Sequence, residues 1–543
     1  MKQLVQDISK PRHPESDPLP MTGLQITKGR NLLSLLALDS ESPILIVGKG
    51  LGTWKGVFPQ AQYCTTIHSI PNEPEKYDLV LLDCSSAGST GDLVHVLVQI
   101  ERRMSGKGAL ILLARNRFSF ERMKGLIKPV ALSRDEHTYS YSQIMNAATS
   151  ALFPHIRAFL PFSGGEAVQG IDEMVAPDSR FLEIPHYSNP IKKIAHSIGK
   201  YYLIHDSFAI LCTHNPLSHN RLFEEIKTSL EGGDESGKVA LHLERFDIRD
   251  RGALVLFLKT IKENKPSYVV TRVVHDLRKR EVIKKNHDFL KYLYSIKGLS
   301  KSFKTKLPTP LSDFSFKKGH VFIETLIPGT LAWKANNTKI AKKILKDAQQ
   351  FSLHLSQVTG CRTCLDKKVL DDLFREDERR INESRICSES FKRTLIEEIA
   401  TIKNTVAGQY MWLAAAHGDY GYGNILVDPS DGRLNGVIDW DTARAREFPA
   451  VDLINMGMQR RRIEQRMSIE EAINDVVKTC LETGGEQEGF ANIDHNIFTV
   501  LAHISLIRDI SRSLLYPDLF LMGQEEQLQA LSALKQNYPL ILH

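Results

Sequence analysis

The chain has 543 residues, too many for one ordinary domain, and its length predicts two or three. A hydrophobic content of 42% and a charged content of 25% are typical of a soluble globular protein. The net charge of +6 is spread over the whole chain and does not indicate nucleic-acid binding. We interpret the basic runs at 275–285 and 459–466 as solvated helix faces rather than polyphosphate sites.

The N-terminus and the cysteines both favour a cytoplasmic protein. Residues 1–22 form a polar, proline-containing lead-in without the apolar core of a signal peptide. No apolar run approaches the ~20 residues that a membrane span needs. The seven cysteines are odd in number and scattered, which fits a reducing compartment. Cys361 and Cys364 lack a second pair with zinc-site spacing, so we interpret them as a reduced surface pair.

The first predicted domain spans residues 23–214 and alternates strands with helices. A helical pattern, "GRNLLSLLALD", precedes a buried strand at 43–48. Two further buried strands cover 77–84 and 108–114, with an amphipathic helix at 92–104 between them. Such alternation is typical of a mostly parallel, doubly wound sheet. We read 200–213 as a late strand pair, which completes an α/β, Rossmann-like domain.

A second domain is expected to begin after a boundary near 214–220 and to cover residues 221–543. Its first part, about 221–330, is mainly β with one long helix at 282–296. Two strands surround an Asp-Arg-Gly turn in 238–261, and further strands are predicted at 267–276 and 319–329. The second part, about 331–543, is largely helical from about 338 onward. Only a polar, glycine-containing loop with its strand and the segment 432–441 interrupt these helices.

That loop, "AHGDYGYGNILVD" (416–428), carries the strongest functional signal. The strand that follows it forms a hairpin with 432–441, so Asp419, Asn424 and Asp439 are expected to converge on one point. Phosphoryl transfer needs this set: one carboxylate takes the proton of the attacking hydroxyl, and an amide and a carboxylate hold Mg²⁺. The alternative is a polar hairpin with ordinary turn residues.

The motifs "HGDYGYGN", "VIDWD" and "FPAVDL" resemble those of the aminoglycoside phosphotransferase / choline kinase family, relatives of the protein kinases. The resemblance covers roughly residues 221–543 and implies an α+β, bilobal, protein-kinase-like fold that uses ATP and Mg²⁺. It also implies a role for each motif residue: Asp419 as catalytic base, Asn424 and Asp439 as magnesium ligands, His417 as a brace of the loop, and Asp452 as a hydrogen-bond acceptor for the loop backbone.

The nucleotide-binding half departs from the family pattern. Such kinases use a strand lysine that holds the ATP phosphates and pairs with a helix glutamate. The strand "YVVTRVVHD" has Arg272 (or Thr271) at the expected place, and the next helix offers Asn286 or Asp288. A guanidinium is always charged and can bind phosphate in a fork. The alternative makes Arg272 a surface residue on an edge strand.

Element order alone places Glu324 and Leu326, in "VFIETLIPG", where backbone groups would meet adenine. A second nucleotide motif is excluded. The run "GGDESGKV" (232–239) has the spacing of a P-loop, but Val239 replaces the Ser or Thr that binds magnesium. The run also follows a helix and precedes a strand, the reverse of the required order.

The first domain contains "IVGKGLGTW", in which Gly48, Gly50 and Gly52 follow the first strand. Glycines there let a ligand approach the backbone. With "KYDLVLLDC" and "SGKGALILLARN", residues of about 30–213 resemble a class I methyltransferase core, which implies S-adenosylmethionine as cofactor. The next strand, in "QYCTTIHS", lacks the acid that would hold the cofactor ribose. A working methyltransferase and a degenerate Rossmann-like domain both stay open.

The sequence therefore predicts an ATP- and magnesium-dependent phosphotransferase that acts on a hydroxyl of a small molecule or saccharide and carries a methyltransferase-like domain. Kinase–methyltransferase fusions that modify bacterial polysaccharide ends resemble this architecture, which makes a glycan or envelope precursor a candidate acceptor. Two alternatives are an impaired nucleotide-binding scaffold and a bifunctional methyltransferase–kinase. No nucleic-acid partner is expected, and the sequence specifies neither the acceptor nor the oligomeric state.

Overall fold

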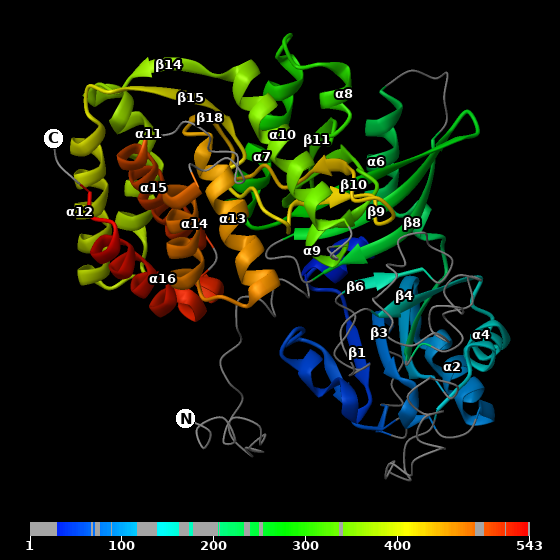
Figure 1. Cartoon of the computed structure of the whole chain (residues 1–543). Coiled ribbons are helices and arrows are strands. Elements are labelled where there is room, and N and C mark those ends of the chain that lie inside the picture. The colour runs from blue at the N-terminus through cyan, green and yellow to red at the C-terminus, as the bar shows by residue number, and fades with distance from the viewer. Residues whose placement is uncertain are drawn as a thin grey trace. The chain divides into compact units, whose positions relative to one another are not determined.

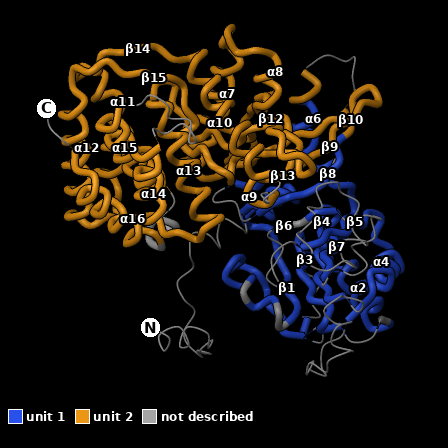
Figure 2. The backbone as a smooth tube through the Cα atoms, viewed as in Figure 1, with its two compact units in different colours: residues 1–228, 241–256 blue, residues 229–240, 257–543 orange. Residues whose placement is uncertain are grey.

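The computed structural model describes residues 30–540 except for the following segments: 67–68, 71–75, 88–89, 117–137, 162–172, 177–204, 206, 233–238, 249–252, 336–339, 484–493 and 516. Contacts divide the chain into two units (Figure 2). The first unit comprises residues 1–228 and 241–256, and the second comprises 229–240 and 257–543. Each unit has its own buried apolar core. The predicted lead-in at 1–22 lies outside the described residues.

The first unit contains a parallel group of strands in the order β2-β1-β3-β4 (Figure 1). The members of this group are β1 (Ile44–Val47), β2 (Gln62–Cys64), β3 (Tyr77–Asp83) and β4 (Met104–Arg115). Every residue of β1 and β3 is buried, as strands covered on both faces require. The predicted strands at 43–48, 77–84 and 108–114 are therefore present.

Antiparallel strands extend this sheet beyond β4. They are β7 (Ser207–Thr213), β5 (His155–Pro161), β6 (Glu173–Val175) and β8 (Ala240–Asp247). Of the predicted strand pair at 200–213, β7 is described, whereas 200–204 lies outside the described residues. Helices described in this unit include α2 (Thr90–Arg103), α4 (Tyr141–Ser150) and α6 (Arg221–Glu231). α2 buries a stripe at helical spacing, namely Leu93, Val96, Leu97 and Ile100.

The second unit begins with an antiparallel sheet in the order β11-β12-β10-β9. Its strands are β9 (Ala253–Lys262), β10 (Lys265–Val274), β11 (Pro310–Phe316) and β12 (Gly319–Thr325), and the helices α7 (Leu277–Ser295) and α8 (Lys301–Lys304) accompany them. Glu263 and Asn264 both have positive φ and join β9 to β10 by a two-residue turn. β10 lies between β9 and β12, so the alternative that put Arg272 on an edge strand is wrong.

The remaining described helices of the second unit lie in its C-terminal part, where α9 contacts β16 and α10 contacts β17. They are α9 (Ala332–Ala335), α10 (Ala341–Thr359), α11 (Lys367–Glu383), α12 (Glu389–Val406), α13 (Ala450–Gln465), α14 (Ile469–Thr483), α15 (His495–Ser513) and α16 (Pro517–Asn537). The hairpin consists of β16 (Ile425–Val427) and β17 (Leu434–Val437), and β13 (Thr330–Leu331) pairs with β16.

The helical part has more strands than the sequence indicated. β14 (Cys361–Cys364), β15 (Tyr410–Ala416) and β18 (Arg444–Glu447) form a second three-stranded sheet. The expectation of helices interrupted at only two places is therefore wrong. β15 reads "YMWLAAA", and its three alanines favour helix, yet cross-strand pairing on both sides keeps it extended.

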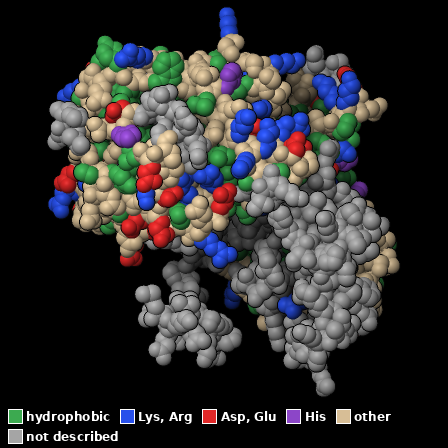
Figure 3. All heavy atoms as spheres, viewed as in Figure 1, with side chains coloured by type: hydrophobic (Ala, Val, Ile, Leu, Met, Phe, Trp, Pro, Cys, Tyr) green, Lys and Arg blue, Asp and Glu red, His purple; other side chains and the backbone are tan. Residues whose placement is uncertain are grey.

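The surface features bear on three further expectations. All seven cysteines are free, and Cys361 is exposed. In the described part of the chain, no helix is long and apolar enough to cross a membrane. On the visible face of the second unit, acidic and basic side chains are interspersed (Figure 3). The basic run at 459–466 is not wholly a solvated face, because Arg461 is buried against Asp475.

Candidate functional site

The loop between β15 and β16 is held by a buried carboxylate. Asp452, in the first turn of α13, accepts hydrogen bonds from the backbone N–H of His417 at 2.7 Å and of Gly418 at 2.8 Å. Burial raises the pKa of Asp452, and these two bonds work in the opposite direction. His417 bonds the carbonyl of Ile438 at 2.8 Å through Nε2, and its ring lies tilted by 53° against that of Trp440, with centroids 4.5 Å apart. The loop backbone is thus anchored to α13 and to the segment after β17.

Two glycines of this loop have specific reasons to be glycine. Gly418 has φ of +80°, and a Cβ there would lie 2.5 Å from the carbonyl oxygen of Thr442. A Cβ at Gly421 would lie 1.9 Å from Oε1 of Gln459. Glycine therefore lets the loop pass close to two neighbouring segments, and this close passage brings Asp419 next to Gln459.

Asp419 and Asn424 meet across the loop. The side-chain amide of Asn424 donates to Oδ2 of Asp419 at 3.1 Å and to its backbone carbonyl at 2.9 Å. Both bonds use the amide nitrogen, which leaves the amide oxygen of Asn424 as a ligand for a cation. A hard cation such as Mg²⁺ takes oxygen ligands of this kind.

Asp439 follows β17 and has φ of +60°, a conformation that is uncommon outside glycine and that often marks functional positions. Its side chain is 50% exposed, and Oδ1 accepts a bond of 3.1 Å from Arg272. The hairpin pairs Ile425 with Val437, so Asn424 and Asp439 flank the same end of it. One amide oxygen and one carboxylate at this end suit a magnesium ion that keeps several waters.

Arg272 pairs within the second unit with two carboxylates from different segments. It forms ion pairs with Glu324 of β12 and with Asp439, and its side chain is 16% exposed. Asn286 of α7 donates to Glu324 at 3.1 Å and accepts from the backbone N–H of Trp440 at 2.8 Å. Asn286 thus connects β12 to the residue after Asp439, whereas Asp288 is exposed and pairs with Lys284.

The two residues predicted to contact adenine, Glu324 and Leu326, bond other groups of the protein. The backbone N–H of Leu326 donates to the carbonyl of Tyr268 at 2.9 Å, so it is already used inside the protein. Glu324 is buried, and its side chain faces Arg272 and Asn286. The role of both residues toward adenine stays a prediction.

A carboxylate that the sequence reasoning did not single out lies two residues after Asp439. Burial raises the pKa of Asp441, and the negative charges of Asp439 and Asp419 add to that shift. The second aspartate of "VIDWD" was visible in the sequence. In the described part of the chain, no three His, Cys, Asp or Glu side chains are grouped to hold a metal, so a cation site here needs the amide of Asn424.

The sequence reasoning also missed the residues that contact Asp419 from the helices. Arg512, in the last turn of α15, forms an ion pair with Oδ1 of Asp419 and a second one with Asp509. Gln459 of α13 lies 3.4 Å from the same oxygen. No sequence motif marks Arg512 or Gln459. Both belong to helices whose hydrophobic pattern indicates only which side chains are buried.

A buried charge network lies one turn further back on α15. Arg508 pairs with Asp377 of α11 and, through Nε at 2.8 Å, with Glu447 of β18. Arg444 donates to both oxygens of Asp377 at 3.0 and 2.9 Å. Burial raises the pKa of Glu447 to about 7, while Arg444 lowers it, and burial lowers the pKa of Arg508 to about 9. The network ties β18, which pairs with β15, to α11 and α15.

In the first unit, Gly48 has φ of +126°, and a Cβ there would lie 2.5 Å from Cβ of Asp83. After Gly48 the chain enters a 3-10 helix, η1 (Lys49–Lys55), which contains Gly50 and Gly52. β2 ends at Cys64 without a carboxylate. The freedom of Gly48 therefore serves its approach to the end of β3, and this contact alone explains the glycine.

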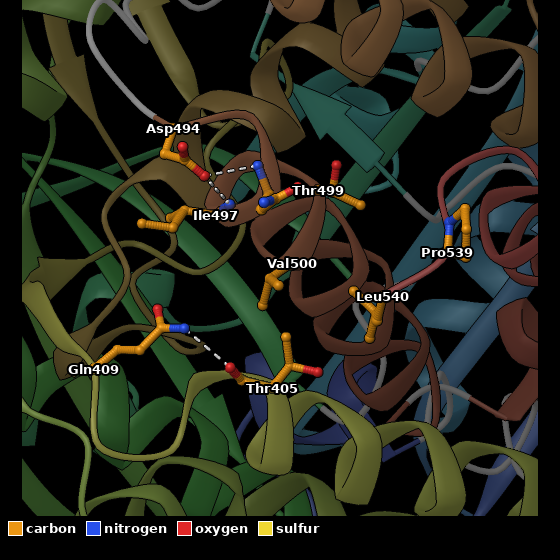
Figure 4. Close-up of a pocket in the computed structure, with 9 residues that line it drawn as sticks. Thr405, Gln409, Asp494, Ile497, Thr499, Val500, Pro539 and Leu540 are labelled. Atoms are coloured by element: carbon orange, nitrogen blue, oxygen red, sulfur yellow. Dashed lines mark hydrogen bonds between the residues drawn. The ribbon is translucent and has the colours of Figure 1, made fainter. Parts of the chain in front are cut away.

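One cavity of about 170 Å³ lies away from these residues (Figure 4). It is lined from the ends of α12 and α15 and from the C-terminal segment by residues that include Gln409, Ile497, Val500 and Leu540. Gln409 bonds the carbonyl of Thr405 at 3.0 Å, as Figure 4 shows. Along α15, Ile497 and Arg512 are separated by roughly 20 Å at 1.5 Å per residue. The cavity shares no residue with the candidate site.

Residues 251–476 match the family model of the phosphotransferase enzyme family (APH). The match covers less than half of the chain and places a phosphotransferase-family region in its C-terminal part. No curated protein sequence matches the chain.

Solved structures similar to this chain include two kinases. An aminoglycoside-3'-phosphotransferase of type VIII shares 15% identity over 53% of this chain and 99% of its own, with a TM-score of 0.34. An ethanolamine kinase of Plasmodium vivax shares 15% over 58% and 89%, with a TM-score of 0.35. WbdD, solved with the kinase inhibitor LY294002, shares 10% over 96% and 99%, with a TM-score of 0.27. Because these TM-scores are below 0.5, function must be inferred from the family match and the site.

Proposed function

We propose that the second unit transfers the γ-phosphoryl group of ATP to a hydroxyl of a small molecule or saccharide. The observation that carries the proposal is the contact of Asp419 with Asn424, together with the placement of Asn424 and Asp439 at the same end of the β16–β17 hairpin. The family match over 251–476 supports the same reaction class.

Each residue of the trio has a distinct role in this proposal. Asp419 accepts the proton of the acceptor hydroxyl. The oxygen of that hydroxyl attacks the γ-phosphorus, and ADP leaves. The amide oxygen of Asn424 and the carboxylate of Asp439 would hold Mg²⁺. When bound, that ion neutralises negative charge on the phosphates. His417 and Asp452 keep the loop backbone in place.

For nucleotide binding we propose Arg272 as the phosphate clamp. Its partner is Glu324 from the neighbouring strand, in place of the helix glutamate of related kinases. The side-chain amide of Asn286 bonds both Glu324 and the backbone N–H of Trp440. Helix α7 thus links β12 to the residue after Asp439 through this amide. Glu324 and Leu326 stay predictions as backbone contacts of adenine.

For the first unit we propose a degenerate Rossmann-like domain with a binding or packing role. β2 ends without the acid that would hold a ribose, and Gly48 packs against Asp83. Domain bounds of 23–214 and 221–543 are part of this proposal. S-adenosylmethionine or its demethylated product should not raise the melting temperature of the chain. A clear rise with either compound would restore methyl transfer as a candidate activity.

The main proposal is tested by incubating the full chain with Mg²⁺, labelled ATP and an extract of small metabolites and glycans. We expect label on a metabolite or glycan. Asp419→Asn should lower this transfer at least ~100-fold, because the base is lost while the fold stays intact. Asp288→Asn, an exposed aspartate of α7, is the control and should transfer normally.

Three outcomes would contradict the proposal. Full transfer by Asp419→Asn would refute the assigned mechanism. If no acceptor is labelled and Mg²⁺–ATP at millimolar concentration leaves the melting temperature unchanged, the chain is a scaffold without nucleotide binding. A rise in melting temperature without transfer would instead indicate a nucleotide-binding pseudoenzyme.

A further inference from the structure

The candidate base, Asp419, is contacted by a positive charge from α15. Arg512 pairs with Oδ1 of Asp419, and Gln459 approaches the same oxygen at 3.4 Å. Oδ2 of Asp419 accepts from Asn424 at 3.1 Å. An acceptor hydroxyl that reaches Asp419 must therefore lie beside the guanidinium of Arg512.

The position of Arg512 is itself supported. Its second Nη pairs with Asp509, and the other oxygen of Asp509 accepts from Gln527 of α16 at 3.3 Å. Ser513 donates to the amide oxygen of Gln527 at 3.3 Å. Both carboxylate oxygens of Asp509 are thus engaged within the protein, and the carboxylate holds Arg512 in place. The side chain of Arg512 is 20% exposed, so solvent reaches it.

We propose that Arg512 determines the charge class of the acceptor: it excludes compounds with an ammonium group next to the reacting hydroxyl and admits those with uncharged or anionic oxygens there. Neutral and acidic sugars belong to the admitted class, and amino alcohols and amino sugars to the excluded one. This inference rests on the proposed phosphotransferase function.

The physical reason is electrostatic and geometric. A guanidinium stays positively charged at every physiological pH and donates hydrogen bonds in a planar fork, so it binds oxygen acceptors and repels ammonium groups. Repulsion between two unit charges falls only as the inverse of their distance, and it is stronger in a partly buried site than in water. A substituent on the carbon next to the reacting hydroxyl lies within a few ångströms of that hydroxyl.

The neighbouring carboxylates do not reverse this preference. Asp509 is engaged as described, and Asp439 pairs with Arg272 and is the proposed ligand of a cation. The charged group that contacts the base directly is Arg512.

The charge class of the acceptor can be measured before the acceptor is identified. A metabolite and glycan extract is passed over a cation exchanger at neutral pH, which gives a retained, cationic pool and a flow-through pool. Each pool is then incubated with the full chain, Mg²⁺ and labelled ATP. We expect the label on compounds from the flow-through, at least ~10-fold above the retained pool.

Label mainly on compounds of the retained pool would overturn the role of Arg512 and leave the phosphotransferase proposal intact. Label in neither pool would overturn both, because no acceptor would then exist in the extract. The two failures are therefore distinguishable.

Variants separate charge selection from a merely structural role. Arg512→Gln should raise the ratio of retained-pool to flow-through label at least ~10-fold, and Arg512→Lys, which keeps the charge, should leave this ratio near that of the unmodified chain. Arg379→Gln, an exposed arginine of α11, is the control. Should Arg512→Gln lower the label from both pools equally, Arg512 only positions Asp419, and the inference is wrong.

Discussion

Two glycine-rich segments, one in each unit, follow buried strands, and their glycines do different things. In the second unit, Gly418 and Gly421 let a loop pass close to Thr442 and Gln459, and that loop carries Asp419 and Asn424 into contact. In the first unit, Gly48 lets the chain pass close to Asp83. The comparison teaches that glycine spacing reports close backbone approach, and that polar residues held beside the glycines identify the chemistry.

The largest effect is expected at Asp452, which anchors the glycine-rich loop of the second unit. Asp452→Ala leaves the N–H groups of His417 and Gly418 without their partner in a buried place. Each unsatisfied group costs about 1–3 kcal/mol, so the free energy of unfolding should fall by roughly 2–6 kcal/mol. Phosphoryl transfer should fall at least ~100-fold as the loop moves. Denaturant unfolding and label transfer measure the two effects.

Asp452→Asn is the milder variant, because it keeps one acceptor oxygen. Its free energy of unfolding and its phosphoryl transfer should both fall less than those of Asp452→Ala. An Asp452→Ala variant with unchanged activity would show that the loop does not need this anchor.

The next effect concerns Gly48, in the glycine-rich segment of the first unit. Gly48→Ala forces a Cβ against Asp83 at a φ that side chains rarely adopt, and we expect a loss of roughly 2–4 kcal/mol in the stability of the first unit. Faster hydrogen exchange in β1 and β3 would report it. Gly106→Ala, with no neighbour within 4 Å of the added Cβ, is the control. Equal protection in both variants would contradict the stated role of Gly48.

A pH effect is expected from the buried network of Arg508, Asp377, Arg444 and Glu447. The pKa of Glu447 is raised from 4.5 to about 7 by burial, so the native state binds more protons than the unfolded state between these values. The free energy of unfolding should therefore decline as pH rises from about 4.5 to about 7, with a share of about 1–3 kcal/mol from this group.

Glu447→Gln should remove that share of the decline, which denaturant titrations at several pH values would measure. Glu383→Gln, an exposed glutamate of α11, should keep the slope of the unmodified chain. A Glu447→Gln curve parallel to the unmodified one would show that Glu447 stays ionised throughout.

The smallest effect tests Gln459. A Cβ at Gly421 meets the flexible end of Gln459, which can rotate away, so Gly421→Ala should cost less than ~1 kcal/mol in stability and lower transfer only several-fold. Gly423→Ala in the same loop meets nothing within 4 Å and should be neutral. Adding Gln459→Ala to Gly421→Ala should cause little further loss; an additive loss would show that the two positions act independently.

The sequence predicted the local features well. Buried runs such as β3 and the hairpin of β16 and β17 were recognisable because their apolar pattern and turns lie within a few residues. Among the site residues, Asp419 and Asn424 belong to one motif, and Asp439 belongs to a second motif shortly after it. β14, β15 and β18 were missed because the alanines of β15 favour helix and because their pairing partners lie far away in the sequence.

The contacts between distant segments could not be predicted. Arg272 meets Glu324 and Asp439, residues that lie 52 and 167 positions further along the chain. Arg512 meets Asp419 over 93 positions. No local pattern encodes such distances, because the packing of whole elements determines which long side chains meet. The sequence therefore indicated the chemistry of the loop and left its charged surroundings open.

The arrangement of α15 separates two tasks that could otherwise constrain each other. Arg508 joins the buried network with Asp377 and Glu447, while Arg512, one turn later, contacts Asp419, the proposed base. Selection could therefore replace residue 512 and change which compounds are accepted without disturbing the network that keeps the helix in place. An enzyme engineer who wants a new acceptor would begin with that last turn of α15.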